Sequence, residues 1–350
     1  MMITPVTHLV PLAYIRRERM LPGTGQVLVS LNQHVNATDI VAEAAMTGQH
    51  LLLDIRKALN LRDSDDISKI IEYKSGENIE KGDILAQTGG MLPRVVRAPV
   101  NGKIVAIHRG LVILEHSNPK YEMAAAISGI VTEILPERGV MIESNGALIQ
   151  GVWGNGRINQ GLLRITDQPA EEELTPALLD ISMRGAVVLA SFVTKPETLE
   201  TAARLPLRGL ILSSMSANLI PQAQKLTFPI ILLEGFGQIP MNQAAFQLLI
   251  TNEKREVCLN SEWNPGRGEK PEIFIPLPAE GKPLQEYAEL AAGKTVRVTV
   301  PPYSGQVATL VELLTGITTL SNGKQVKAAR IRLNNGQTVV VPLANMDVLE

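Results

Sequence analysis

Val35-Asn-Ala-Thr-Asp-Ile-Val-Ala42 is followed 44 residues later by a similar stretch, Ile79-Glu-Lys-Gly-Asp-Ile-Leu-Ala86. Asp39 and Asp83 occupy the same place in the two stretches, and the apolar positions keep the same phase. A second pair of similar stretches lies at Gly102–Glu115 and Gly129–Glu143. Repeated strand-turn-strand units of this size predict a pseudo-symmetric β structure folded from similar halves.

The second of these copies carries a family resemblance. Ser75-Gly-Glu-Asn-Ile-Glu-Lys-Gly-Asp-Ile-Leu-Ala86, followed by Val96-Arg-Ala-Pro-Val-Asn-Gly-Lys-Ile-Val-Ala-Ile107, resembles the biotinyl/lipoyl-like barrel-sandwich hybrid family. In that family a G-x-x-V-x-x-G-D-x-L-A hairpin precedes an A-P-x-x-G-x-V hairpin. Gly82-Asp83 and Asn101-Gly102 are tight-turn pairs between alternating apolar positions, as such hairpins need. The resemblance covers about a third of the chain, or half if the first copy is included.

One departure from the family bears on function. Carrier members present a modifiable lysine between the two hairpins, whereas Gln87-Thr-Gly-Gly-Met-Leu-Pro-Arg-Val95 has no lysine. We therefore expect no biotin, lipoate or other cofactor. The unmodified relatives of the family serve as adaptor and docking domains, and the resemblance implies a role of that kind.

Composition excludes several classes of protein. The 350 residues include 33 Lys+Arg and 35 Asp+Glu, so the net charge of −2 gives no polybasic nucleic-acid coat. Aromatic residues make up only 3%, which leaves few platforms for stacking on unpaired bases. The single Cys258 excludes an internal disulfide framework, and we expect it to be a buried, inert thiol on a core strand. The N-terminus lacks the pattern of a secretory signal and the apolar runs are too short to span a membrane, so we expect a soluble, cytoplasmic protein.

Residues 181–262 change to an alternating pattern. Continuous apolar runs, which predict strands buried on both faces, are each followed by a segment with helical spacing; the strands are expected at Gly185–Val193, Leu207–Ser213, Phe228–Leu233 and Glu256–Asn260. Thr194-Lys-Pro-Glu197 is a capping box with Pro in the first turn of the first helix. The alternation predicts a small parallel sheet covered by helices.

The last third of the chain returns to β patterning. Residues 264–284 hold five Pro and three Gly and predict a linker. From Gly293 onward, short strands and the turn Asn334-Asn-Gly336 predict a small barrel that resembles the KOW/SH3-like barrel of transcription elongation factors and ribosomal proteins. The expected fold is therefore multidomain, α/β and all-β: residues 1–170, a barrel-sandwich hybrid region with one helix around Ile40–Leu59; 171–263, parallel α/β; 264–292, a linker; and 293–350, the barrel.

Three places in the sequence are candidates for binding. Gly235-Phe236-Gly237 follows the carboxyl end of a predicted strand, the place where parallel sheets bind anions or ligands. It lacks the remaining residues of a dinucleotide or phosphate motif. The segment is therefore either a ligand-binding loop or a structural turn. Trp153 with Arg157 can anchor a docking partner, or the neighbouring glycines can simply permit close packing. In the C-terminal barrel, six basic residues against three acidic ones suggest a nucleic-acid or partner face, carried by Arg297, Lys324, Lys327 and Arg330.

No candidate catalytic or metal-binding constellation has the right residue types at the right spacing. All five histidines precede residue 117, so a His-based site inside residues 181–262 is excluded. We expect no enzyme, but an interaction or assembly protein with a protein partner or with copies of itself. Two alternatives remain: a KOW-type accessory factor of ribosome or RNA polymerase, and a catalytically inactive relative of a carrier or swivelling-domain enzyme component.

Overall fold

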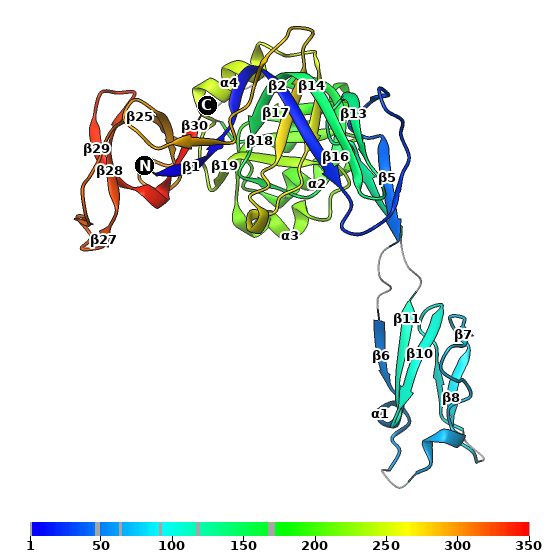
Figure 1. Ribbon diagram of the computed structural model, residues 1–350. Coiled ribbons are helices and arrows are strands. Elements are labelled where there is room, and N and C mark those ends of the chain that lie inside the picture. The colour runs from blue at the N-terminus through cyan, green and yellow to red at the C-terminus, as the bar shows by residue number, and fades with distance from the viewer. Residues whose placement is uncertain are drawn as a thin grey trace. The chain divides into compact units, whose positions relative to one another are not determined.

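A computed structural model of the chain describes residues 2–45, 50–62, 65–90, 93–116, 120–166 and 172–349 (Figure 1). The protein is mostly β, with several sheets. It divides into two compact units: unit 1 comprises residues 1–20, 28–41 and 124–350, and unit 2 comprises residues 21–27 and 42–123. Both segments of unit 2 are thus inserted in the chain of unit 1, a division that differs from the predicted one.

The core of unit 1 is a twelve-stranded sheet, and four of its strands are parallel: β16 (Ile158–Ile165), β17 (Ala186–Ala190), β18 (Gly209–Met215) and β19 (Ile230–Phe236). Every residue of β17 and β18 is buried, as the continuous apolar runs predict. Beyond β16 the pairing becomes antiparallel, through β20 (Glu256–Asn260), β21 (Glu272–Pro276), β14 (Gly139–Gln150) and β13 (Gly129–Leu135).

Short helices cover both faces of the parallel strands. Leu199 of α2 (Pro196–Arg204) and Ala223 of α3 (Ile220–Ala223) pack on one face, and Leu249 of α4 (Gln243–Ile250) packs on the other. Pro196 lies in the first turn of α2 as predicted, but the predicted capping box is wrong, because the N-cap is Lys195 and no side chain caps this helix. Asn242 caps α4: its Oδ1 accepts from the N–H of Ala245 at 2.8 Å.

The predicted boundary after residue 170 falls inside this sheet. β16, before the boundary, pairs with β17, after it, and β21 of the predicted linker lies between β20 and β14. The change of pattern near residue 180 therefore marks a change within one sheet, where the pairing passes at β16 from antiparallel to parallel.

The C-terminal segment forms a second sheet of unit 1. Its seven strands run in the order β23 (Tyr287–Glu289), β1 (Ile3–Thr7), β30 (Met346–Leu349), β24 (Thr295–Val298), β25 (Val307–Leu313), β28 (Ala328–Leu333) and β29 (Thr338–Pro342). The strands and the Asn334–Gly336 turn predicted here are present. The N-terminal strand β1, which the predicted division assigns to residues 1–170, pairs in parallel with β30 instead.

Unit 2 contains a four-stranded sheet in the order β6 (His50–Asp54), β11 (Leu111–His116), β10 (Gly102–His108) and β7 (Asn78–Ile79). The helix predicted around Ile40–Leu59 is wrong: β5 (Ile40–Ala45) and β6 occupy most of that range, and only α1 (Ile55–Leu59) is helical. The helix-favouring Ala-Glu-Ala residues of β5 pair instead with β3 (Gln26–Val27), so tertiary pairing overrides local propensity.

The sequence repeat has a structural counterpart in both units. In the first copy, Asp39 Oδ2 accepts from the N–H of Asn36 at 2.8 Å; in the second, Asp83 Oδ2 accepts from the N–H of Glu80 at 2.9 Å. These are the same turn, in which an Asp side chain holds the backbone three residues earlier.

The strands around the two turns also correspond. Val35 of β4 (His34–Val35) lies opposite Gly129, and Ile79 of β7 lies opposite Gly102. In each copy, therefore, the strand before the Asp turn pairs with the first residue of a later hairpin. Both glycines are required by close approach: a Cβ would lie 2.4 Å from Glu143 O at Gly129 and 2.3 Å from Glu115 O at Gly102. Each following hairpin, β13–β14 and β10–β11, has a register shift near its start.

The second copy interrupts the first. In the second copy, β8 (Ile84–Gln87) follows the Asp83 turn and pairs with β9 (Val95–Arg97) across a short loop. In the first copy, β5 follows the Asp39 turn and neighbours β12 (Lys120–Ala124) in a three-stranded sheet. The segment between β5 and β12 in the first copy corresponds to the loop between β8 and β9 in the second. In the first copy, this segment contains the entire second copy. The two repeats are therefore nested.

Candidate functional site

A buried ion pair joins the end of the parallel sheet to the C-terminal sheet. Arg297 of β24 places Nη1 3.6 Å from Glu234 Oε2, and the two side chains are 5% and 0% exposed. Arg297 also donates from Nη1 to the carbonyl of Leu233 at 2.8 Å and from Nη2 to Asp347 Oδ2 at 3.1 Å. A buried guanidinium needs such partners to offset its lost hydration.

Glu234 also fixes the start of the next helix. Its Oε1 accepts from the backbone N–H of Asn242 at 3.1 Å and from the Asn242 side-chain amide, while Asn242 caps α4. The other carboxylate oxygen, Oε2, is buried without a hydrogen bond and faces Arg297. One carboxylate thus connects β19, α4 and β24.

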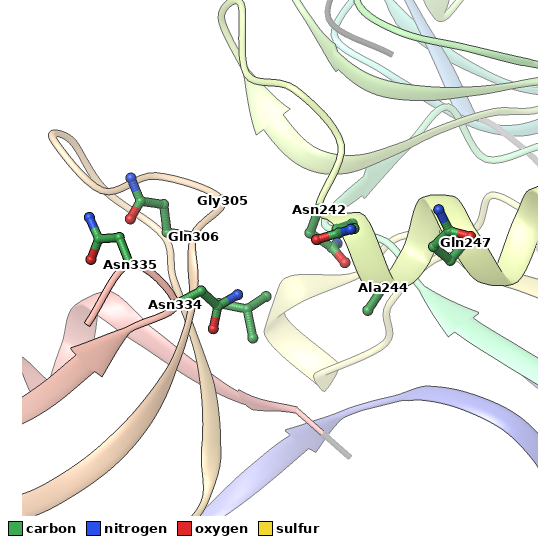
Figure 2. A pocket seen from close by; sticks show the side chains of 9 residues that line it. Asn242, Ala244, Gln247, Gly305, Gln306, Asn334 and Asn335 are labelled. Atoms are coloured by element: carbon green, nitrogen blue, oxygen red, sulfur yellow. The ribbon is translucent and has the colours of Figure 1, made fainter. Parts of the chain in front are cut away.

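Beside this ion pair lies an open cleft of about 590 Å³ (Figure 2). Figure 2 shows the amides of Gln306, Asn334 and Asn335 on the side of the C-terminal sheet, and those of Asn242 and Gln247 on the side of α4. Six of the nine residues that line the cleft are Asn or Gln, and none of the nine is charged. Each amide both donates and accepts, so the cleft suits neutral groups such as peptide amides or hydroxyls.

A second group of buried charges lies around β2 (Leu9–Met20) and β21. Arg17 donates to both oxygens of Glu272, at 3.0 and 2.7 Å, and Gln150 Nε2 donates to the same carboxylate at 2.9 Å. Burial by itself raises the pKa of Glu272, but Arg17 and Gln150 outweigh it, so the net pKa lies below its ordinary value.

His8 and Lys270 extend this group. The His8 ring is buried, with Nε2 3.7 Å from Glu286 Oε2 and no hydrogen bond to either ring nitrogen. It lines a groove of about 540 Å³ formed with β2 and residues 280–285. Burial lowers the pKa of Lys270, whose Nζ donates to Thr7 Oγ1. These contacts join β1, β2 and β21, and they give the groups a structural role.

The predicted ligand loop overlaps the end of β19: Gly235 and Phe236 are its last two residues and pair with Ser214 and Met215 of β18, and Gly237 follows the strand. Gly235 and Gly237 have φ of 112° and 127°, which glycine adopts without strain. Ser214 Oγ accepts from the N–H of Ile239 at 2.9 Å, and Gly237 N donates to Met215 O. These contacts hold the end of β19 and the residues that follow it against β18.

The two residues of the predicted docking pair, Trp153 and Arg157, differ in exposure. Trp153 is only 4% exposed and meets the edge of Phe236, with ring centroids 5.8 Å apart, whereas Arg157 is exposed. Trp153 therefore contributes to the core and does not present its ring to a partner.

One residue of the predicted basic face, Arg297, is buried, and the other three are exposed. Lys324, Lys327 and Arg330 are exposed, and Arg330 pairs with Glu312 on the neighbouring strand. Arg297 is buried in the ion pair described above, so it is not part of a surface. Arg332, which shares the exposed face of β28 with Arg330, takes its place in the group.

Sequence reasoning missed the roles of Glu234 and Arg297. Arg297 lies between Val296 and Val298, so strand alternation places it on the face opposite the two valines and predicts an exposed side chain. No local signal in the sequence points to its burial or to its partner. Cys258 is buried as predicted; burial raises its pKa, and its Sγ lies 3.2 Å from Ser128 Oγ. Among the residues that the structure describes, no three His, Cys, Asp or Glu side chains are grouped to hold a metal ion.

Comparison with known proteins adds no family. Neither the protein-family models nor the curated proteins give a match to this sequence. In the described parts of the chain, no helix combines the length and apolar character needed to cross a membrane.

Proposed function

We propose that the chain is a non-enzymatic interaction protein of the cytoplasm, an adaptor that presents β modules to a protein partner. The observation that supports this most is the nesting of the repeats, since one copy carries the other in the place of a hairpin loop. Insertions are tolerated at exposed loop tips, where an added module stays accessible. The nesting also fits the resemblance of residues 75–107 to barrel-sandwich hybrid domains without a modifiable lysine.

Exposed apolar side chains on unit 2 support the same proposal. Leu52, at the centre of β6, is 60% exposed. Leu52 lies directly opposite Ile113 in the pairing of β6 with β11, so the two side chains share a face of the sheet. Apolar groups gathered on one face of a small sheet are typical of surfaces that meet a partner.

The experiment is affinity capture on the immobilised full chain from nuclease-treated extract of the native cell, at about 50 and 300 mM salt. An adaptor should retain the same protein partner at both concentrations, since its contacts are largely apolar. Loss of all retained material at the higher concentration, or retention of ribosomal or polymerase components alone, contradicts the proposal.

One observation favours the KOW-type accessory factor as a second candidate. Lys324, Lys327, Arg330 and Arg332 are exposed on and beside β28, an arrangement that suits phosphate contacts. Reversal of Lys324, Lys327 and Arg330 to Glu should abolish salt-sensitive capture of ribosome or polymerase if this function is correct. It should leave capture by an adaptor unchanged.

A further inference from the structure

Strand β6 is an edge strand of unusual composition. It pairs with β11 on one side, and no described strand pairs with its other side. Its sequence is His50-Leu-Leu-Leu-Asp54, with Leu51 37% and Leu52 60% exposed. Soluble proteins usually protect such an edge with charges, proline or a bulge, because its free backbone groups can pair with another chain.

The register shows which backbone groups are free. Ile55 N donates to Gly110 O at 2.9 Å, and the pairing continues with Leu53 opposite Val112 and Leu51 opposite Leu114. Hydrogen-bonded positions alternate along an antiparallel pair, so Leu51 and Leu53 face β11. The N–H and C=O of Leu52, at the centre of the strand, point away from it.

The side chains of β6 are complementary to a second β6 running antiparallel. With Leu52 on the twofold axis, the two Leu52 residues form a hydrogen-bonded pair, and His50 of each copy lies opposite Asp54 of the other. A histidine that donates a hydrogen bond, and carries a positive charge when protonated, thus meets a carboxylate twice. Leu52 and Ile113 of both copies would form one apolar row across the joined sheets.

We propose that β6 is a self-association site, at which two copies of this chain join their unit 2 sheets edge to edge about Leu52. The inference rests on the proposed function, for which it names a partner and a surface. Two five-residue strands bury much less than the roughly 1,200 Å² of a stable interface, so the dimer is weak, with a dissociation constant of about 10–100 µM.

The test is sedimentation equilibrium of the full chain from about 5 to 500 µM. Leu52→Lys sets two lysines against each other on the axis and should weaken the dimer at least tenfold. Because Leu52 is already exposed, thermal unfolding of this variant should match that of the parent. The matched control is Val105→Lys, an exposed apolar residue on β10, which lies between β11 and β7. It should change the dissociation constant by less than about twofold.

Position 50 gives a second, independent readout. His50→Lys keeps a cation opposite Asp54 and should preserve or tighten the dimer, whereas His50→Glu opposes two carboxylates and should weaken it. A monomer at about 500 µM, or a dimer that none of these substitutions at positions 50 and 52 affects, overturns the inference. If the chain is monomeric yet captures a protein partner, only this inference fails. If it dimerises yet captures nothing else, the site stands and the role as an adaptor to other proteins fails.

Discussion

Arg297 Nη1 lies 3.6 Å from Glu234 Oε2, which pairs a cation of the C-terminal sheet with a carboxylate at the end of the parallel strands. Neither side chain is more than 5% exposed, and Arg297 also holds the carbonyl of Leu233. Loss of one partner from such a pair leaves a buried charge without compensation, which is more costly than loss of the pair.

Arg297→Ala should therefore lower the free energy of unfolding by about 3–5 kcal/mol in urea titrations. The double variant Arg297→Met/Glu234→Gln should be more stable than Arg297→Ala, because it leaves no unpaired carboxylate. Arg330→Ala is the control: it removes an exposed arginine paired with Glu312 and should cost less than about 1 kcal/mol. If Arg297→Ala and Arg330→Ala lower the free energy of unfolding equally, the buried Glu234–Arg297 pair contributes no more to stability than an exposed pair.

The two Asp turns allow a matched pair of substitutions. Asp39→Ala and Asp83→Ala each remove the side-chain acceptor for a backbone N–H and should each cost about 1 kcal/mol. Because the turns belong to different units, hydrogen exchange should accelerate in residues 125–143 for Asp39→Ala and in residues 98–116 for Asp83→Ala. Exchange that accelerates equally in both segments for either variant contradicts the division into two units.

Much of this fold could be predicted from local sequence, but its long-range pairing could not. The strands at Leu207–Ser213 and Glu256–Asn260 were predicted because apolar runs are local signals. The pairing of β14 with β21 and of β1 with β30 joins segments far apart in the chain. Apolar patterning gives the face that a strand buries and says nothing about which strand lies beside it.

The candidate site shows the same limit. Glycines mark the segment beginning at Glu234 and a basic charge marks Arg297, yet no periodicity in the sequence relates the two residues. Their pairing depends on the placement of β24 against the end of β19, which follows from the packing of the two sheets. The matching stretches around Asp39 and Asp83 predicted the repeat itself, but they did not predict that one copy lies inside the other.

The contribution of the Arg17–Glu272 ion pair to the free energy of unfolding should decrease in acid. A carboxyl group whose pKa is lower in the folded than in the unfolded chain contributes stability above its unfolded pKa and loses it as pH falls through the folded value. Glu272→Gln should therefore be less stable than the parent at pH about 6, and the difference should narrow below the ordinary glutamate value of 4.5. Urea unfolding at several pH values between about 6 and 3 measures this. A difference that is independent of pH contradicts the assignment.

Cys258 should be unreactive in the folded protein. It is fully buried, and burial raises the pKa of its thiol, so little thiolate is present or accessible. An aromatic disulfide reagent should modify it at least about a thousandfold more slowly in buffer than in concentrated urea. Rapid modification in buffer would mean that strand β20 opens readily.

The central claim, that the chain recognises protein rather than nucleic acid, is tested most directly by fluorescence anisotropy of labelled 20-nucleotide RNA and duplex DNA titrated with the full chain. At about 150 mM salt we expect no saturable binding tighter than about 10 µM, and no difference between the parent and the Lys324→Glu/Lys327→Glu/Arg330→Glu variant. Submicromolar binding that weakens steeply with salt, and that this variant abolishes, would contradict the account.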